Sequence, residues 1–299
     1  MCGIVGLYLK DKKLESQLGH LFTPMLIEMT NRGPDSAGVA VYRDPVPKNE
    51  LKITLAHTNP AYDWQAIAGA LTELHGKTTA RKLGNHCVLV TKASEDEVRT
   101  YLAEEASDVR IVGVGHVIEI FKEVGLPKDV AEMYDLENVK GSHIIGHTRM
   151  ATESAVTTAG SHPFATGQDL CLVHNGSLSN HNRLREWLTT HAGMSFQTEN
   201  DTEVAAAYLT WRLREGASLK EALEFSLEDL DGFYTFVAGT ADGFAVLRDP
   251  IACKPAVMAE TDEWVAFGSE FRALRSLPGV DKARVWEPEP AIVYSWGKA

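Results

Sequence analysis

The sequence predicts a mixed α and β (α+β) fold, and three observations support this prediction. Residues 2–9, CGIVGLYL, form an apolar run with a glycine on each side of Ile4 and Val5, which is typical of a buried strand. Residues 14–29 carry apolar side chains at helical spacing and predict an amphipathic helix. The C-terminal third alternates strand-like runs with turns, as in FYTFVAGTADGFAVLRDP, and predicts hairpins.

The remaining elements follow in chain order. NRGPDSAG predicts a loop before a strand at 39–43, and a small α/β insertion is expected over 44–108. The stretch 116–134 predicts a helix that leads into a strand ending in GHTRM. A buried strand then reaches Asn175 and Gly176, a helix capped by Ser179 or Asn180 follows, and another helix begins near Asp201.

Composition narrows the classes of partner. The chain has 299 residues and a formal net charge of -12, so its surface repels phosphate-rich nucleic acid and anionic membranes at long range. The N-terminal apolar run precedes its charges, which is the wrong order for a signal peptide, and no stretch reaches the roughly twenty apolar residues of a membrane span. We expect a cytoplasmic protein that binds a small molecule or another protein.

Four cysteines, widely spaced along the chain, fit neither a disulfide framework nor a cluster of metal ligands. Cys2 is distinctive because removal of Met1 would place a thiol and a free α-amine on one residue. An α-amine has a pKa of about 7.7 to 8.0, so it can take the proton of the thiol and return it to a leaving amine. The alternative is that a cysteine follows methionine by chance.

Three further positions can be interpreted with Cys2. Arg149 ends a predicted strand and can bind a carboxylate in bidentate fashion, or form a structural ion pair. Asn175 and Gly176 follow a buried strand and can donate to an oxyanion, or make an ordinary Asn-Gly turn. Asp201 can bind an ammonium group, or cap its helix. A substrate with a carboxylate, an ammonium group and an amide matches all of them together, and glutamine has all three.

Seven motifs occur in one order along the chain: CGIVG, NRGPDSAG, GHTRMAT, HPF at 162–164, HNG at 174–176, NDTE at 200–203, and RDP followed by KP at 248–255. By these motifs the chain resembles the class II glutamine amidotransferases, which are N-terminal-nucleophile hydrolases. The resemblance covers nearly the whole chain outside the insertion.

The resemblance implies a four-layer αββα sandwich forming one glutamine amidotransferase type-2 domain over 1–299, with the insertion at 44–108 inside it. It implies that Cys2 is the nucleophile, that Asn175 and Gly176 form the oxyanion hole, and that Arg149 and Asp201 hold the α-carboxylate and α-amine of glutamine. It also implies supporting positions around the substrate at Arg32, Thr152 and His162. The chain departs from the common pattern in having Met150 in place of an aromatic residue and Glu153 in place of a histidine.

Within the family, the GHTRMATESAVTTAGSHPF segment is similar to stand-alone subunits related to glutamate synthase, such as the first subunit of N-methylglutamate synthase. The resemblance implies partner subunits that carry flavin and iron-sulfur groups and receive the ammonia, within a hetero-oligomer. No flavin-binding or clustered-cysteine motif is present in the sequence, so we expect the chain itself to hold no cofactor or metal. Two alternatives remain: hydrolysis of another γ-glutamyl or N-alkyl amide, and a non-catalytic assembly subunit.

Overall fold

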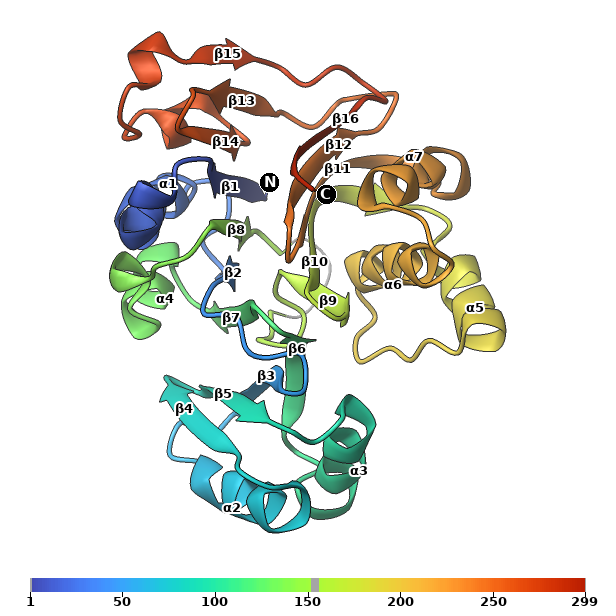
Figure 1. Ribbon diagram of the computed structural model, residues 1–299. Helices are drawn as coiled ribbons and strands as arrows, with labels where there is room; N and C mark the ends of the chain where they lie inside the picture. The colour runs from blue at the N-terminus through green and yellow to red at the C-terminus, as the bar shows by residue number, and fades with distance from the viewer. Residues whose placement is uncertain (1, 152–155, 299) are drawn as a thin grey trace.

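The computed structural model describes residues 2–151 and 156–298. Two antiparallel sheets pack face to face, and helices cover the outer face of each, as Figure 1 shows. The seven-stranded sheet runs in the order β15 (Arg284–Trp286), β13 (Val257–Glu260), β14 (Trp264–Gly268), β1 (Gly3–Leu9), β8 (His143–Arg149), β2 (Ser36–Tyr42) and β7 (Ile118–Val124). The five-stranded sheet runs in the order β16 (Val293–Gly297), β12 (Gly243–Arg248), β11 (Gly232–Thr240), β10 (Leu170–Leu178) and β9 (Phe164–Gly167).

The helices form the two outer layers (Figure 1). The seven-stranded sheet is covered by α1 (Leu18–Glu28) and α4 (Pro127–Met133), and by the short 3-10 helices η2 (Leu136–Asn138) and η3 (Phe271–Leu274). The five-stranded sheet is covered by α5 (His181–Ala192), α6 (Asp201–Arg214) and α7 (Leu219–Asp229). The predicted four-layer αββα arrangement is therefore confirmed.

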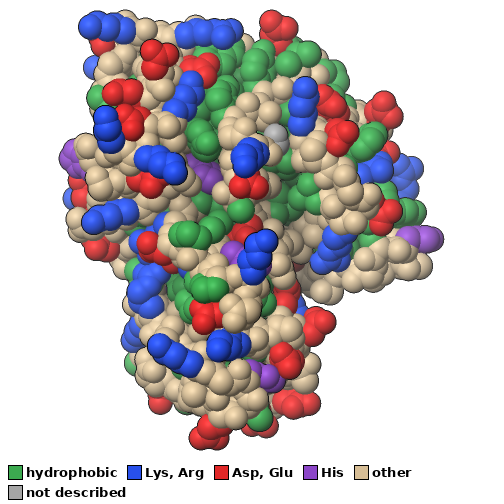
Figure 2. Space-filling view, in the orientation of Figure 1, with side chains coloured by type: hydrophobic (Ala, Val, Ile, Leu, Met, Phe, Trp, Pro, Cys, Tyr) green, Lys and Arg blue, Asp and Glu red, His purple; other side chains and the backbone are tan. Residues whose placement is uncertain are grey.

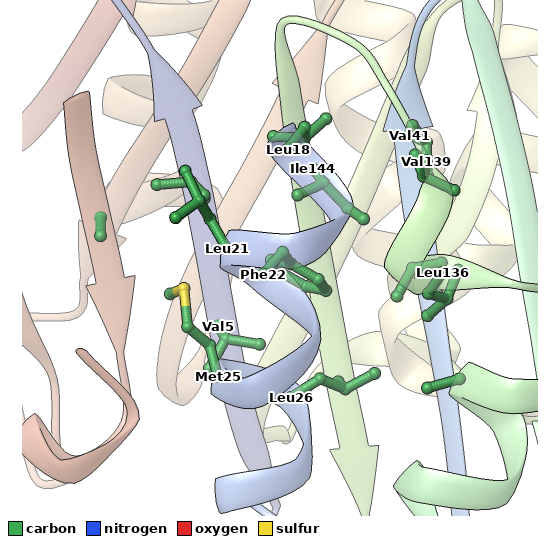
Figure 3. Close-up of a cluster of buried hydrophobic side chains, with 14 of the residues drawn as sticks. Val5, Leu18, Leu21, Phe22, Met25, Leu26, Val41, Leu136, Val139 and Ile144 are labelled. Atoms are coloured by element: carbon green, nitrogen blue, oxygen red, sulfur yellow. The ribbon is translucent and has the colours of Figure 1, made fainter. Parts of the chain in front are cut away.

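Each layer contact has its own apolar core. Between the two sheets, Ile4 and Ile145 pack with Val173 and Val237, all at most 1% exposed. In Figure 3 the apolar face of α1 lies on β1 and β8, with Phe22 beside Ile144. A further cluster lies beneath α6, whose Val204 and the run of alanines after it are fully buried. Because strands at the centre of the sandwich are buried on both faces, their apolar runs, such as Ile144–Ile145 in β8 and Leu170–Val173 in β10, do not alternate with polar residues.

Residues 51–115 form a separate sheet below the sandwich, here called the module. Its strands run in the order β4 (Thr79–Leu83), β5 (His86–Thr91), β3 (Leu51–Ala56) and β6 (Arg110–Gly115), and they are covered by α2 (Trp64–His75) and α3 (Glu95–Glu105). Ser94 caps α3 through a capping box with Glu97, as its sequence favours.

A buried carboxylate joins the module to the sandwich. Glu119 of β7 lies 2.7 Å from Arg43, 3.1 Å from Lys52 of β3 and 2.6 Å from Arg81 of β4. Burial alone would raise the pKa of Glu119, but the three cations outweigh it and lower that pKa. The ionised carboxylate therefore stabilises the contact between the two parts.

The prediction of a helix over 116–134 was wrong for its first half. Residues Ile118–Val124 form β7, the edge strand of the large sheet, and only Pro127–Met133 is helical. Ile118, Ile120 and Phe121 are all fully buried, because β7 packs on both faces. The apolar residues at 117, 120, 121 and 124 recur at helical spacing, so the local pattern favours a helix although the segment pairs as a strand.

The surface is mixed in character. Figure 2 shows positive and negative side chains interspersed over the module, while hydrophobic side chains gather over the ends of β12 and β16. Among the residues that the structure describes, no helix has both the length and the apolar character that crossing a membrane requires.

Candidate active site

Cys2 lies at the head of the central strand β1. Its neighbour Gly3 pairs with Thr148 of β8, so the antiparallel register sets Cys2 beside the end of β8, where Arg149 lies. The thiol is half-buried, and its Sγ lies 4.0 Å from the carbonyl oxygen of Met150. Strand pairing, rather than proximity in sequence, therefore brings Cys2 and the GHTRM motif together.

The main-chain carbonyl of Cys2 is fixed by two side chains. Nε of Arg32 donates to it over 2.9 Å, and Nδ2 of Asn175 donates over 3.3 Å. Arg32 is itself held by Glu270, whose Oε1 accepts from Nη1 over 2.7 Å. The sequence analysis did not find Glu270, since it follows β14 near the other end of the chain and belongs to no motif.

Asn175 and Gly176 lie in β10, on the sheet that faces β1. Gly176 has φ +154°, and a Cβ there would lie 2.0 Å from the carbonyl oxygen of Phe233 and 2.7 Å from Nε2 of His174. No side chain fits in that space, so glycine is required. The pair forms part of β10, which continues to Leu178, rather than an isolated Asn-Gly turn.

Asp201 is the first residue of α6, but it does not cap the helix. The N-cap is Asn200, whose Oδ1 accepts from the backbone N–H of Thr202 over 2.8 Å. Oδ2 of Asp201 instead accepts from the N–H of Leu178 over 2.9 Å, and Oδ1 lies 3.6 Å from Nδ1 of His174. Burial would raise the pKa of Asp201, but the hydrogen bond and charge of His174 and the Leu178 N–H lower it to about 2.

Arg149 is the last residue of β8, and it is only 6% exposed. Its guanidinium lies against the backbone of Gly160, where an added Cβ would stand 3.5 Å from Nη1. The carbonyl of Gly160 in turn accepts from Nδ2 of Asn200 over 3.5 Å, next to Asp201. The guanidinium of Arg149 and the first turn of α6 therefore border the same short segment.

Three buried histidines line the space between the two sheets. The rings of His147 and His162 stack with their centroids 3.9 Å apart. The hydroxyl of Thr202 is hydrogen-bonded to Nε2 of His162 over 2.8 Å and to Nδ1 of His174 over 3.0 Å. Desolvation lowers the pKa of His147 to about 3 and that of His162 well below its usual value, so both rings are neutral near pH 7.

His162, predicted as a supporting position around the substrate, is thus part of this buried layer and contacts Thr202. Arg32 lies beside Cys2, as described above. Thr152 and Glu153 lie outside the described residues. Within residues 2–151 and 156–298, no group of three or more His, Cys, Asp or Glu side chains is arranged to hold a metal ion.

Comparison with known proteins identifies the family. Residues 147–276 match the glutamine amidotransferase domain family. The glutamine amidotransferase-like protein GlxB of Rhizobium meliloti is 57% identical over 297 residues, which cover 99% of this chain and 98% of that protein. The chain belongs to the class II glutamine amidotransferases.

A second relative agrees with this family, and a solved structure shares the fold. A putative glutamine amidotransferase of Methanothermobacter thermautotrophicus is 34% identical over 305 residues, covering 98% of this chain and 99% of that protein. The glutamine phosphoribosylpyrophosphate amidotransferase of B. subtilis has a similar fold, with a TM-score of 0.61 at 21% identity. That likeness covers all of the amidotransferase but only 49% of the solved chain, so the amidotransferase spans about half of its length. The resemblance stated from the motifs is confirmed.

Proposed function

We propose that the amidotransferase hydrolyses L-glutamine to glutamate and ammonia through a thioester on Cys2. In this reaction the Sγ of Cys2 attacks the side-chain amide carbon, and the carbon–nitrogen bond breaks as ammonia leaves. The freed α-amine takes the thiol proton and delivers it to the leaving nitrogen. Water then attacks the thioester, releasing glutamate and restoring the thiol.

The remaining roles follow from charge and geometry. Nδ2 of Asn175 and the N–H of Gly176 would stabilise the oxyanion of the tetrahedral intermediate. The guanidinium of Arg149 would bind the α-carboxylate, since the fork of an arginine matches the two carboxylate oxygens. The carboxylate of Asp201, with its pKa lowered to about 2, is ionised at any working pH and would bind the α-ammonium.

One observation carries this proposal more than any other. Arg32 and Asn175 both donate to the carbonyl of Cys2, so two side chains from distant parts of the fold hold the second residue of the chain. A thiol-bearing residue held in this way beside the buried Arg149 supports a role in catalysis rather than one in packing.

We further propose that the ammonia passes to a partner synthase subunit of the glutamate synthase or N-methylglutamate synthase type. This part rests on the similarity of the GHTRMATESAVTTAGSHPF segment to stand-alone subunits of such enzymes. It predicts a hetero-oligomer in which flavin and iron-sulfur groups lie on other chains. The type-2 domain would then span 1–299, with the insertion at 44–108 available for contacts specific to this subunit.

Mass spectrometry and a product assay together test the proposal. We expect the purified protein to lack Met1 and to release glutamate from glutamine, and a glutamine analogue with an electrophilic side chain to label Cys2. Cys2→Ala should abolish glutamate release and leave the folded structure unchanged, because a half-exposed terminal thiol contributes little packing. Glutamate release at the original rate by Cys2→Ala would refute the proposal.

The same assay separates the alternatives. Hydrolysis of N-alkyl or other γ-glutamyl amides in preference to glutamine would indicate a different leaving group. Inertness toward every amide, with Met1 retained, would indicate an assembly subunit.

A further inference from the structure

Lys122 of β7 is a buried lysine that donates to a single backbone segment. Its Nζ donates to the carbonyl oxygen of Ser161 over 2.8 Å, and to those of Ala159 and Pro163 over 3.2 Å each. The side chain is 6% exposed, and its ammonium lies 4.5 Å from the centre of the Phe164 ring. The three hydrogen atoms of an ammonium match these three acceptors, so Lys122 fastens the segment 159–163 to the edge strand.

That segment borders the candidate glutamine site. Gly160 lies against the guanidinium of Arg149 and accepts from Asn200, and His162 is hydrogen-bonded to Thr202 at the start of α6. The segment also presses on β2, because a Cβ at Gly38 would lie 2.2 Å from the carbonyl oxygen of His162. A shift of the segment would therefore move the surroundings of both proposed glutamine clamps.

We propose that Lys122 is a positioning residue for glutamine binding, which holds the segment 159–163 so that Arg149 and the first turn of α6 keep the geometry that binds the substrate. This inference rests on the proposed function, since it concerns the same site. Lys122 acts through the segment and does not touch the substrate. It belongs to none of the seven motifs, and its sequence surroundings, IEIFKEV, also contain Glu119 and Glu123, so the sequence does not single it out.

The electrostatics make Lys122 costly to bury. Desolvation lowers the pKa of Lys122 to about 7, although the carboxylate of Glu203 opposes this shift and Arg110 adds to it. His86 and His162, which also face it, have lowered pKa values that keep them neutral. An apolar side chain would avoid this cost, so the three backbone carbonyls that surround Nζ favour a role in holding the segment 159–163.

Glutamine binding in a Cys2→Ala background tests the inference, because this variant cannot turn over the ligand. We expect Lys122→Met to raise the Kd for glutamine by about tenfold, measured by calorimetry at pH 7. We expect its Tm to change by no more than a few degrees, since removal of the costly buried charge offsets the loss of the donor to three backbone carbonyls. A variant that lost stability and affinity together would indicate a merely structural role.

Lys52 provides a matched control. It is also buried, at 2% exposed, and its Nζ donates to the carbonyls of Arg43 and Asp44 over 2.8 Å each. It lies in the module, where it also pairs with Glu119 over 3.1 Å. Lys52→Met should leave the Kd for glutamine unchanged. Hydrogen exchange should become faster over residues 159–163 in Lys122→Met and not in Lys52→Met.

The outcomes separate the two proposals. If Cys2→Ala does not bind glutamine, the proposed function fails, and hydrogen exchange alone then decides whether Lys122 holds the segment. If Cys2→Ala binds glutamine and Lys122→Met changes neither Kd nor hydrogen exchange, the inference about Lys122 is wrong.

If Lys122→Met does not fold, hydrogen exchange of the unaltered protein, measured at several pH values, tests the inference instead. Protection of 159–163, corrected for intrinsic rates, should then fall between pH 6 and pH 9, and unchanged protection would refute the inference.

Discussion

The side-chain amide of Asn175 donates to the main-chain carbonyl of Cys2 over 3.3 Å, and so links the two sheets at the head of β1. One amide hydrogen already points at the residue proposed as nucleophile. In the proposed reaction the same group would turn to the oxyanion that forms on the carbon attacked by Cys2. The geometry of the proposed active site therefore depends on the packing of the two sheets, because this contact forms only when both are correctly packed.

Asn175→Ala should lower kcat for glutamine hydrolysis by about 10² to 10³ with little change in KM, because an oxyanion donor acts mainly in the transition state. Steady-state glutamate release measures this effect. Asn59→Ala, in a turn of the module, is the control and should retain full activity. A rise in KM at constant kcat would mean that Asn175 binds the ground state instead.

Asp201→Asn should raise KM for glutamine by about 10²-fold, because the amide keeps the shape but loses the charge that binds an ammonium. The pKa of Asp201 is lowered to about 2, so its contribution is complete above the ordinary carboxyl range and is lost only as the pH falls toward 2. KM measured between pH 5 and pH 7 should show no titration from this group in the parent. An unchanged KM in Asp201→Asn would remove Asp201 from the site.

Acid should destabilise the fold through buried histidines. Burial lowers the pKa of His86, His143 and His147 to about 3 each, whereas an unfolded histidine titrates near 6.5. Unfolding therefore takes up protons below about pH 6.5, and each histidine costs up to about 1.4 kcal/mol of stability per pH unit down to about pH 3. Urea unfolding at pH 7, 5.5 and 4.5 should show a steep fall in the free energy of unfolding. A flat profile would mean that these rings are solvated.

Glu119→Gln should destabilise the protein by about 3 kcal/mol, since it leaves Arg43, Lys52 and Arg81 around a neutral side chain. Glu119 lies where the module joins the sandwich, so KM for glutamine should not change. Urea unfolding and steady-state kinetics on one preparation measure both effects. Glu132→Gln, in an exposed i,i+4 pair with Lys128, is the control and should cost less than about 1 kcal/mol. A Glu119→Gln variant as stable as the parent would contradict the assignment of this ion cluster.

Local patterns sufficed for much of the fold. The apolar run 2–9 is β1 from Gly3, the hairpin around 241–243 is β11 and β12, and Asn180 does cap α5. The helix predicted over 14–29 begins later, because residues 12–17 form a 3-10 helix before α1 starts at Leu18. In these segments the residues that determine the element are neighbours in the chain. The interpretation of 116–134 as one helix failed because the apolar residues of 117–124 recur at helical spacing, whereas pairing with β2 makes this segment a strand.

The sequence by itself determined the residue types of the candidate site and their order in seven motifs, because each motif is a short run with its own chemistry. Only the tertiary structure decided which partners those residues have. Antiparallel pairing of β1 with β8 set Cys2 beside Arg149, packing of the second sheet brought Asn175 to the carbonyl of Cys2, and β7 delivered Lys122 to the segment 159–163. Such contacts join residues far apart in the chain, and local sequence carries no signal for a pairing that exists only once two sheets have packed.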